Sequence, residues 1–178
     1  VSGASQEQAQ PLLGPLYYIR RALQPFAEVS APAAPDAAGA VRANLALNAT
    51  VLMLADIGRL PDQTRERLQT WLETGGVLVR FAGPRLEQGG DDLLPVPLRE
   101  GGRTLGGALS WSEPQAMAEF PEDSPFVGLE LSPDVRIRRQ VLADPVEMTP
   151  DVLVWARLAD GTPLVTARRI GDGHLVLF

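Results

Sequence analysis

The chain contains no cysteine and no lysine, so all 16 of its Lys+Arg residues are arginines. The absence of cysteine excludes disulfides, thiolate metal sites and a cysteine nucleophile. The absence of lysine excludes Schiff-base chemistry and a phosphate-binding P-loop, because both need the lysine amine. The chain therefore lacks groups on which several large enzyme classes depend.

Long apolar runs and positive charge are also scarce. No run approaches the roughly 20 apolar residues that cross a bilayer. The net charge is −6, which disfavours nucleic acid and anionic membrane surfaces as main partners. What remains is 178 residues of 45% apolar composition, which predicts one compact domain over residues 1–178 with a buried core.

The first half contains a strand–helix–strand pattern. Residues 50–55 (TVLMLA) are apolar on both faces, as a parallel strand covered on both sides must be. A helix is expected over about 61–74, with Leu68 and Leu72 on its buried face, until a glycine pair ends it. Residues 77–81 (VLVRF) form the second strand. This spacing predicts a βαβ unit with parallel strands.

An apolar stripe and a loop are expected before this unit. Apolar side chains recur at spacings of four, three and four at Leu12, Leu16, Ile19 and Leu23. This spacing predicts a packing helix that ends at Pro25. Residues 30–40 (SAPAAPDAAGA) show no periodicity and are interpreted as a flexible connection.

The second half predicts an antiparallel meander. Three apolar segments span residues 152–159, 163–170 and 174–178. Asp-Gly and Gly-Asp-Gly turns join these segments, and such turns favour hairpins. The pairing of further strands between residues 98 and 150 stays open.

Several stretches of the sequence resemble a known family. The stretch VLMLADIGRLPDQTRERLQTWLETGGVLVRFAG resembles the core of the class I glutamine amidotransferase-like domain, in the form found in large membrane-anchored bacterial proteins related to aerotolerance regulators. The stretches RFAGPRL, DDLLPV, GGRTLGGALSW and ADGTPLVTARRIGDGHLVLF extend the likeness from about residue 45 to the end.

The resemblance implies an α/β fold: a flavodoxin-like three-layer sandwich with a parallel core and an additional antiparallel β meander at the C-terminal end. It also implies a domain excised from a longer polypeptide whose transmembrane segments lie outside this chain. By the same resemblance, the domain would lie on the periplasmic side of the bacterial inner membrane.

The turn after residues 77–81 decides what the resemblance implies about catalysis. In catalytic relatives this turn holds a cysteine that is paired with a later histidine. Here Ala82 or a neighbour fills that place, and alanine cannot form the thioester intermediate. We therefore expect no glutamine hydrolysis by the family mechanism, no catalytic residue and no cofactor.

Three residues are candidates for a ligand site. Asp56 follows an apolar strand whose carboxyl end is where α/β folds bind ligands, although an aspartate there can also accept backbone N–H bonds in a turn. Arg85 follows the next strand. Arg103 lies within GGRTLGG (101–107), which has the glycines and arginine of an anion cradle. Its spacing matches neither the dinucleotide fingerprint nor the P-loop, so a bulged or twisted hairpin is favoured.

Other polar residues are expected to have structural roles. His174, the only histidine, has no recognisable partner and is interpreted as a surface or edge-strand residue. Asp91 and Asp92 are interpreted as a solvated pair, because the ligand spacing of a calcium loop is missing, so no metal site is expected. The exposed face of an outer strand is predicted to carry Arg136, Arg138 and Arg139.

These features favour a non-catalytic scaffold or interaction domain of a membrane-anchored bacterial protein. Its partner would be another protein or other domains of the same polypeptide. The alternatives are a small-ligand binder or carboxylate-dependent enzyme with its site near Asp56, and a carbohydrate-binding module. The apolar ending at Phe178 reads as a bare strand edge, so we also expect that the polypeptide continues and that this piece self-associates weakly.

Overall fold

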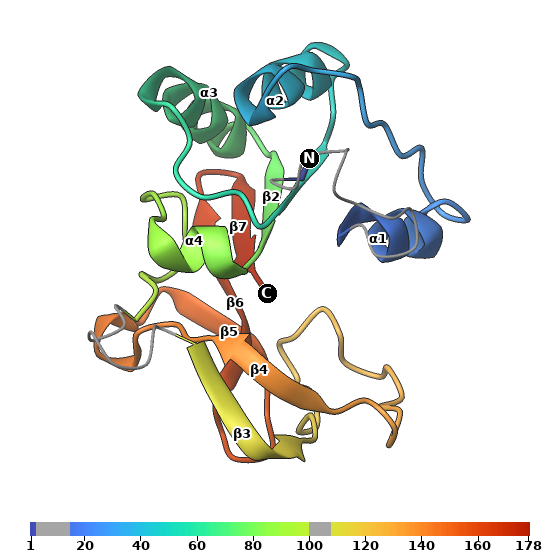
Figure 1. Cartoon of the computed structure of the whole chain (residues 1–178), viewed down its shortest axis with the longest axis vertical. Helices are drawn as coiled ribbons and strands as arrows, with labels where there is room; N and C mark the ends of the chain where they lie inside the picture. The colour runs from blue at the N-terminus through green and yellow to red at the C-terminus, as the bar shows by residue number, and fades with distance from the viewer. Residues whose placement is uncertain (3–14, 100–107) are drawn as a thin grey trace.

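The computed structural model describes residues 1–2, 15–99 and 108–178 (Figure 1). Its centre is a five-stranded sheet of order β1-β2-β7-β6-β5. In that order the strands are β1 (Val51–Ala55), β2 (Val77–Phe81), β7 (Gly173–Leu177), β6 (Pro163–Ile170) and β5 (Val152–Arg157). A separate two-stranded ribbon pairs β3 (Ala108–Gln115) with β4 (Ile137–Val141) in antiparallel fashion.

The strand–helix–strand unit is confirmed. β1 and β2 run parallel, in a register that pairs Val51 with Val77 and Ala55 with Phe81. The helix between them, α3 (Asp62–Glu73), has Leu68 and Leu72 fully buried, as expected. The apolar face of α3 therefore packs on the sheet from the side that the sequence predicted.

The C-terminal meander is also confirmed, but β7 is not an edge strand. It pairs antiparallel with β6 on one side and parallel with β2 on the other, with His174 in register with Val77. The expectation of a bare edge at the end of the chain is therefore wrong. β7 joins the parallel core and the meander into one sheet.

The remaining helices differ in part from expectation. α1 (Pro15–Leu23) confirms a helix before Pro25, yet its Leu16, Ile19 and Leu23 are only half-buried, and the helix stands apart from the sheet in Figure 1. α2 (Ala37–Ala46) begins inside the stretch that was interpreted as a flexible connection.

The start of α2 is set by an aspartate. The Asp36 side chain accepts a hydrogen bond from the Gly39 N–H (2.6 Å), which satisfies one of the free donors of the first helical turn. The physical reason for the difference is this cap, followed by a segment rich in alanine, the best helix former.

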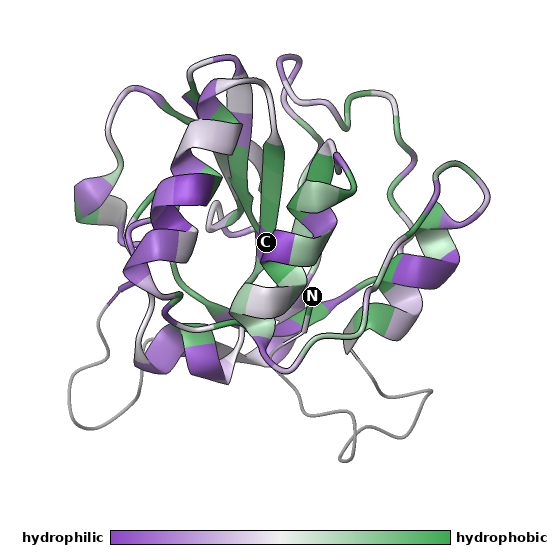
Figure 2. Ribbon diagram, turned by 90° about the horizontal axis from the view of Figure 1, so that it is seen from above, coloured by the Kyte–Doolittle hydropathy of each residue, from purple (hydrophilic) through white to green (hydrophobic). Residues whose placement is uncertain are grey.

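The core lies on both faces of the sheet, which makes three layers. Leu54, Leu68 and Leu78 belong to a cluster between the sheet and helices α2 and α3. On the opposite face, Val79 and Val176 pack under Phe120 and Phe126, which come from an irregular segment. Figure 2 looks down on the helices, and the apolar strands of the sheet are visible in the gap between them. The expected α/β class, with a parallel core and an antiparallel meander, is confirmed.

The segment between residues 98 and 150 forms one isolated antiparallel bridge within itself, from Leu98 to Ala143. A second antiparallel bridge, from Met117 to Leu158, ties the segment to the end of β5. Arg136, just before β4, and Arg138 and Arg139 within it are all exposed, as expected for an outer strand. Arg138 and Arg139 are neighbours in the strand and so lie on opposite faces rather than on one polar face. A short 3-10 helix, η2 (Pro145–Glu147), leads towards β5.

Candidate functional site

Asp56 and Arg85 lie together at the carboxyl ends of β1 and β2. Asp56 directly follows β1 with a left-handed backbone (φ 49°), and its N–H donates to the carbonyl of Phe81 (3.0 Å). Arg85 belongs to α4 (Pro84–Gln88), the short helix after β2. The Arg85 Nη1 lies 3.5 Å from Asp56 Oδ2.

The main contacts of the Asp56 carboxylate are to backbone, not to the guanidinium. Its Oδ1 accepts the N–H groups of Arg85 (2.9 Å) and Leu86 (3.2 Å), which are donors without helical partners at the start of α4. The sequence left open that Asp56 accepts backbone N–H groups within its own turn. The carboxylate does accept backbone N–H groups, but their donors lie 29 and 30 residues away. The ion pair itself is weak, because the Arg85 side chain is 48% exposed.

Gly83 leaves room for this carboxylate. A Cβ added at Gly83 would lie 2.5 Å from Asp56 Cγ and 2.6 Å from Oδ1, closer than any real contact. The φ of Gly83 is −160°, which any residue adopts, so the glycine is required by space and not by backbone conformation. The turn after β2 is consequently shaped to receive Asp56.

Ala82, the first residue after β2, lies in apolar packing. The Ala82 N–H donates to the carbonyl of Phe178 (2.8 Å), and its side chain packs beside the buried Leu86 and Leu177. Next to it, the rings of Phe81 and Phe178 stack with centroids 5.1 Å apart. The third sequence candidate, Arg103, lies outside the described residues.

Sequence reasoning missed a buried ion pair between Arg80 and Asp91. Both side chains are completely buried, and Arg80 Nη1 bonds Asp91 Oδ1. The guanidinium also donates to the carbonyls of Leu93 (3.1 Å), Ile57 (2.7 Å) and Gly58 (3.0 Å). Burial lowers the pKa of Arg80, and the charge of Asp91 opposes that shift.

Asp91 is thus not the solvated residue that its position after two glycines indicated. Its Oδ2 accepts the Leu60 N–H (2.9 Å), so the pair holds two loops against β2. Asp92 alone is exposed, and it binds Arg65 on α3. The missed signal was Arg80 itself, because an arginine inside an apolar central strand needs a buried carboxylate.

His174 lies on the central strand β7 and not at an edge or on the open surface. It is half-buried, with its ring centroid 6.2 Å from that of Trp155. Within residues 1–2, 15–99 and 108–178, no group of three or more histidine or acidic residues could hold a metal ion. The helices in these same ranges include none that is long and apolar enough to cross a bilayer.

Comparison with known proteins gives similarity at the level of fold. No protein-family model and no curated protein matches the chain. The cytoplasmic protein STM3548 from Salmonella typhimurium is similar over 93% of this chain and 75% of its own, with a TM-score of 0.62 and 14% identity. The cytoplasmic protein STM1381 from Salmonella typhimurium LT2 is similar over 72% of this chain and 59% of its own (TM-score 0.53, 12% identity).

A larger enzyme contains a similar unit. The β-galactosidase from Bacillus circulans sp. alkalophilus matches over 77% of this chain, with a TM-score of 0.53 and 16% identity, but the match covers only 21% of the enzyme. At such low identities the three likenesses concern the fold alone. The chain shares an α/β fold with these bacterial proteins.

Proposed function

We propose that this chain is a non-catalytic scaffold or interaction domain. The proposal rests on the contacts at the carboxyl ends of β1 and β2, where α/β folds usually bind ligands. There the Asp56 carboxylate satisfies two backbone N–H groups of α4, and the turn after β2 offers an alanine where a nucleophile would stand. A reaction at this position would need a group that the site does not supply.

The setting of the domain follows from the family resemblance. The motifs around residues 51–83 and the C-terminal meander resemble those of the glutamine amidotransferase-like domains of membrane-anchored bacterial proteins. By that resemblance the domain is periplasmic, and its anchor is supplied by segments outside this chain. Its partners are other domains of the same polypeptide or a separate protein, and it needs no cofactor.

The proposal is tested by incubating the purified domain with glutamine and measuring ammonia. We expect no release above a buffer control. The matched variant is Asp56→Asn, which removes the carboxylate charge while keeping its shape. Ammonia release that survives repurification and is lost in a folded Asp56→Asn variant would overturn the non-catalytic assignment.

A second candidate is small-anion binding at the same strand ends, favoured by the half-exposed guanidinium of Arg85 in α4. Thermal melts with inorganic phosphate and with acetate test it. A rise in melting temperature that disappears in Arg85→Gln, but persists in Arg20→Gln on α1, would favour this candidate over the scaffold.

A further inference from the structure

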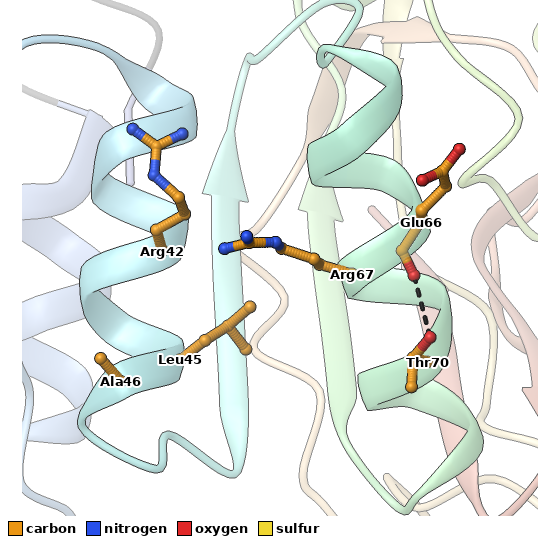
Figure 3. A pocket seen from close by; sticks show the side chains of 6 residues that line it. All are labelled: Arg42, Leu45, Ala46, Glu66, Arg67 and Thr70. Carbon is orange, nitrogen blue, oxygen red and sulfur yellow. Dashed lines mark hydrogen bonds between the residues drawn. The ribbon is translucent and has the colours of Figure 1, made fainter.

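A groove lies between α2 and α3, and its charged lining residues are two arginines and one glutamate. Its volume is about 490 Å³, and it is lined by Arg42, Leu45, Ala46, Glu66, Arg67 and Thr70. In Figure 3, Arg67 extends from α3 towards α2, and Leu45 extends from α2 towards α3. We call this feature the helix groove.

The two arginines of the helix groove lack carboxylate partners. Arg42 and Arg67 are exposed, and neither forms an ion pair within the part of the chain that the structure describes. By contrast Arg65, two residues before Arg67, binds both Asp62 and Asp92. Leu45 is only half-buried. The helix groove therefore suits a segment that brings carboxylates on either side of an apolar side chain.

The same chain displays such a segment at residues 121–130, which we call the acidic turn. Its Glu122, Asp123 and Glu130 are exposed and form no ion pair among the described residues. No basic residue occurs between positions 119 and 135. Val127 and Leu129 are 56% and 62% exposed, so the acidic turn combines negative charge with uncovered apolar side chains.

The acidic turn is held in one shape. The buried Ser124 hydroxyl donates to the carbonyl of Trp155 (2.7 Å), and the Phe126 ring packs against Trp155 and Phe178. Backbone bonds from Val127 N–H to the Ser124 carbonyl (3.1 Å) and from Leu129 N–H to the Phe126 carbonyl (3.0 Å) close successive turns. A partner would meet a preformed surface, so little ordering entropy is lost on binding.

The helix groove and the acidic turn cannot meet within one molecule. α2 and α3 cover one face of the sheet, whereas Phe126 anchors the acidic turn on the opposite face. In Figure 1 the two helices lie at the top, and the acidic turn belongs to the gold segment at the right that leads into β4. Complementary surfaces on opposite sides of a chain can be covered together only by another molecule.

We propose that the acidic turn of one copy of this chain docks in the helix groove of a second copy. The proposal rests on the function proposed above and names the partner of that interaction domain. Because the two surfaces differ, the contact is head-to-tail, and each added copy leaves one groove and one turn free. The contact depends on a few exposed charged side chains, so the association is weak and sensitive to salt.

Charge-reversal variants test the proposal by sedimentation equilibrium at about 50 mM NaCl, where surface charges are weakly screened. The groove variant carries Arg42→Glu and Arg67→Glu, and the turn variant carries Glu122→Arg and Glu130→Arg. We expect wild type to associate with rising concentration and each variant to associate at least tenfold more weakly. A mixture of the two variants should associate better than either alone, because it contains one intact groove and one intact turn.

The matched control is Arg20→Glu with Arg21→Glu on α1, which changes net charge as much as the groove variant does. We expect it to associate as wild type does, and melts of every variant check that folding is retained. A strictly monomeric wild type, an unaffected groove variant, an equal loss in the control or no recovery in the mixture would each overturn the proposal. None of these results touches the non-catalytic assignment, which fails only if the ammonia assay is positive.

Discussion

Replacement of Asp91 by asparagine should destabilise the domain strongly. The substitution keeps the size of the side chain but removes its charge, which leaves the fully buried Arg80 guanidinium without a counter-ion. Breaking a buried pair in this way costs about 3–5 kcal/mol. Arg80 retains three backbone carbonyl acceptors, so we expect the lower end, about 3 kcal/mol. That is a large part of a typical stability of about 5–15 kcal/mol.

Urea unfolding followed by tryptophan fluorescence measures the loss. With a urea dependence of about 1–3 kcal/mol per molar, the midpoint should fall by about 1–3 M. Asp92→Asn is the matched control, because its side chain is 76% exposed and its pair with Arg65 lies at the surface. The control should change stability by no more than about 1 kcal/mol.

A double-variant cycle separates the pair from its surroundings. In an Arg80→Met background no buried charge remains for Asp91 to neutralise, so Asp91→Asn should cost about 0.5–3 kcal/mol less than in wild type. An Asp91→Asn loss below about 1 kcal/mol, or strict additivity in the cycle, would refute the reasoning that the buried pair is energetically coupled.

Three further outcomes are expected. Leu68→Ala should cost about 2–5 kcal/mol in urea unfolding, because the side chain is fully buried between α3 and the sheet. Gly83→Ala should cost about 1–3 kcal/mol, because the new methyl displaces the Asp56 carboxylate from α4. The hydrogen bond and charge of Arg65 lower the pKa of Asp92, so this contribution is present above the unfolded pKa of about 3.9 and is lost as pH falls through the lower folded value. Urea midpoints measured from about pH 5 to pH 3 should therefore fall less in Arg65→Gln than in wild type.

Each of these outcomes has a control. Leu47→Ala removes a leucine that is 63% exposed and should be nearly neutral, so an equal loss would show that Leu68 does not contribute to the core. Gly89→Ala adds a methyl group to open space, and an equal loss there would contradict the crowding argument. An identical acid response in Arg65→Gln would assign the pH dependence to other carboxylates.

The parts of the fold that the sequence predicted are those with local signals. The βαβ unit was predicted because the apolar run of residues 50–55 and the amphipathic helix after it each identify themselves within a few residues. The meander was predicted because Asp-Gly turns specify hairpins. The insertion of β7 beside β2 was not foreseen, since nothing within either strand encodes a pairing across almost 100 residues of chain.

The sequence predicted which residues lie at the candidate site, but not the contacts that they make. Asp56 and Arg85 meet where the strand-end rule places them, yet the carboxylate is directed to backbone N–H groups of α4. The Arg80–Asp91 pair was missed, because Arg80 was taken only as part of an apolar strand and Asp91 as a solvated residue, and only the fold brings them together. Its two halves are visible in retrospect as an arginine that interrupts an apolar strand and an aspartate that follows a glycine pair.

The position of β7 has a consequence for how this domain is made. The strand that completes the parallel core follows every other strand in chain order, so β2 has no neighbour on its inner side until residues 173–177 have left the ribosome. Until then the nascent chain exposes an unpaired apolar edge, which is the kind of surface that chaperones protect and that aggregates form through. Closure of the sheet between such distant segments also makes folding slow relative to a chain of local contacts. The five-stranded sheet can therefore be completed only after β7 has been synthesised.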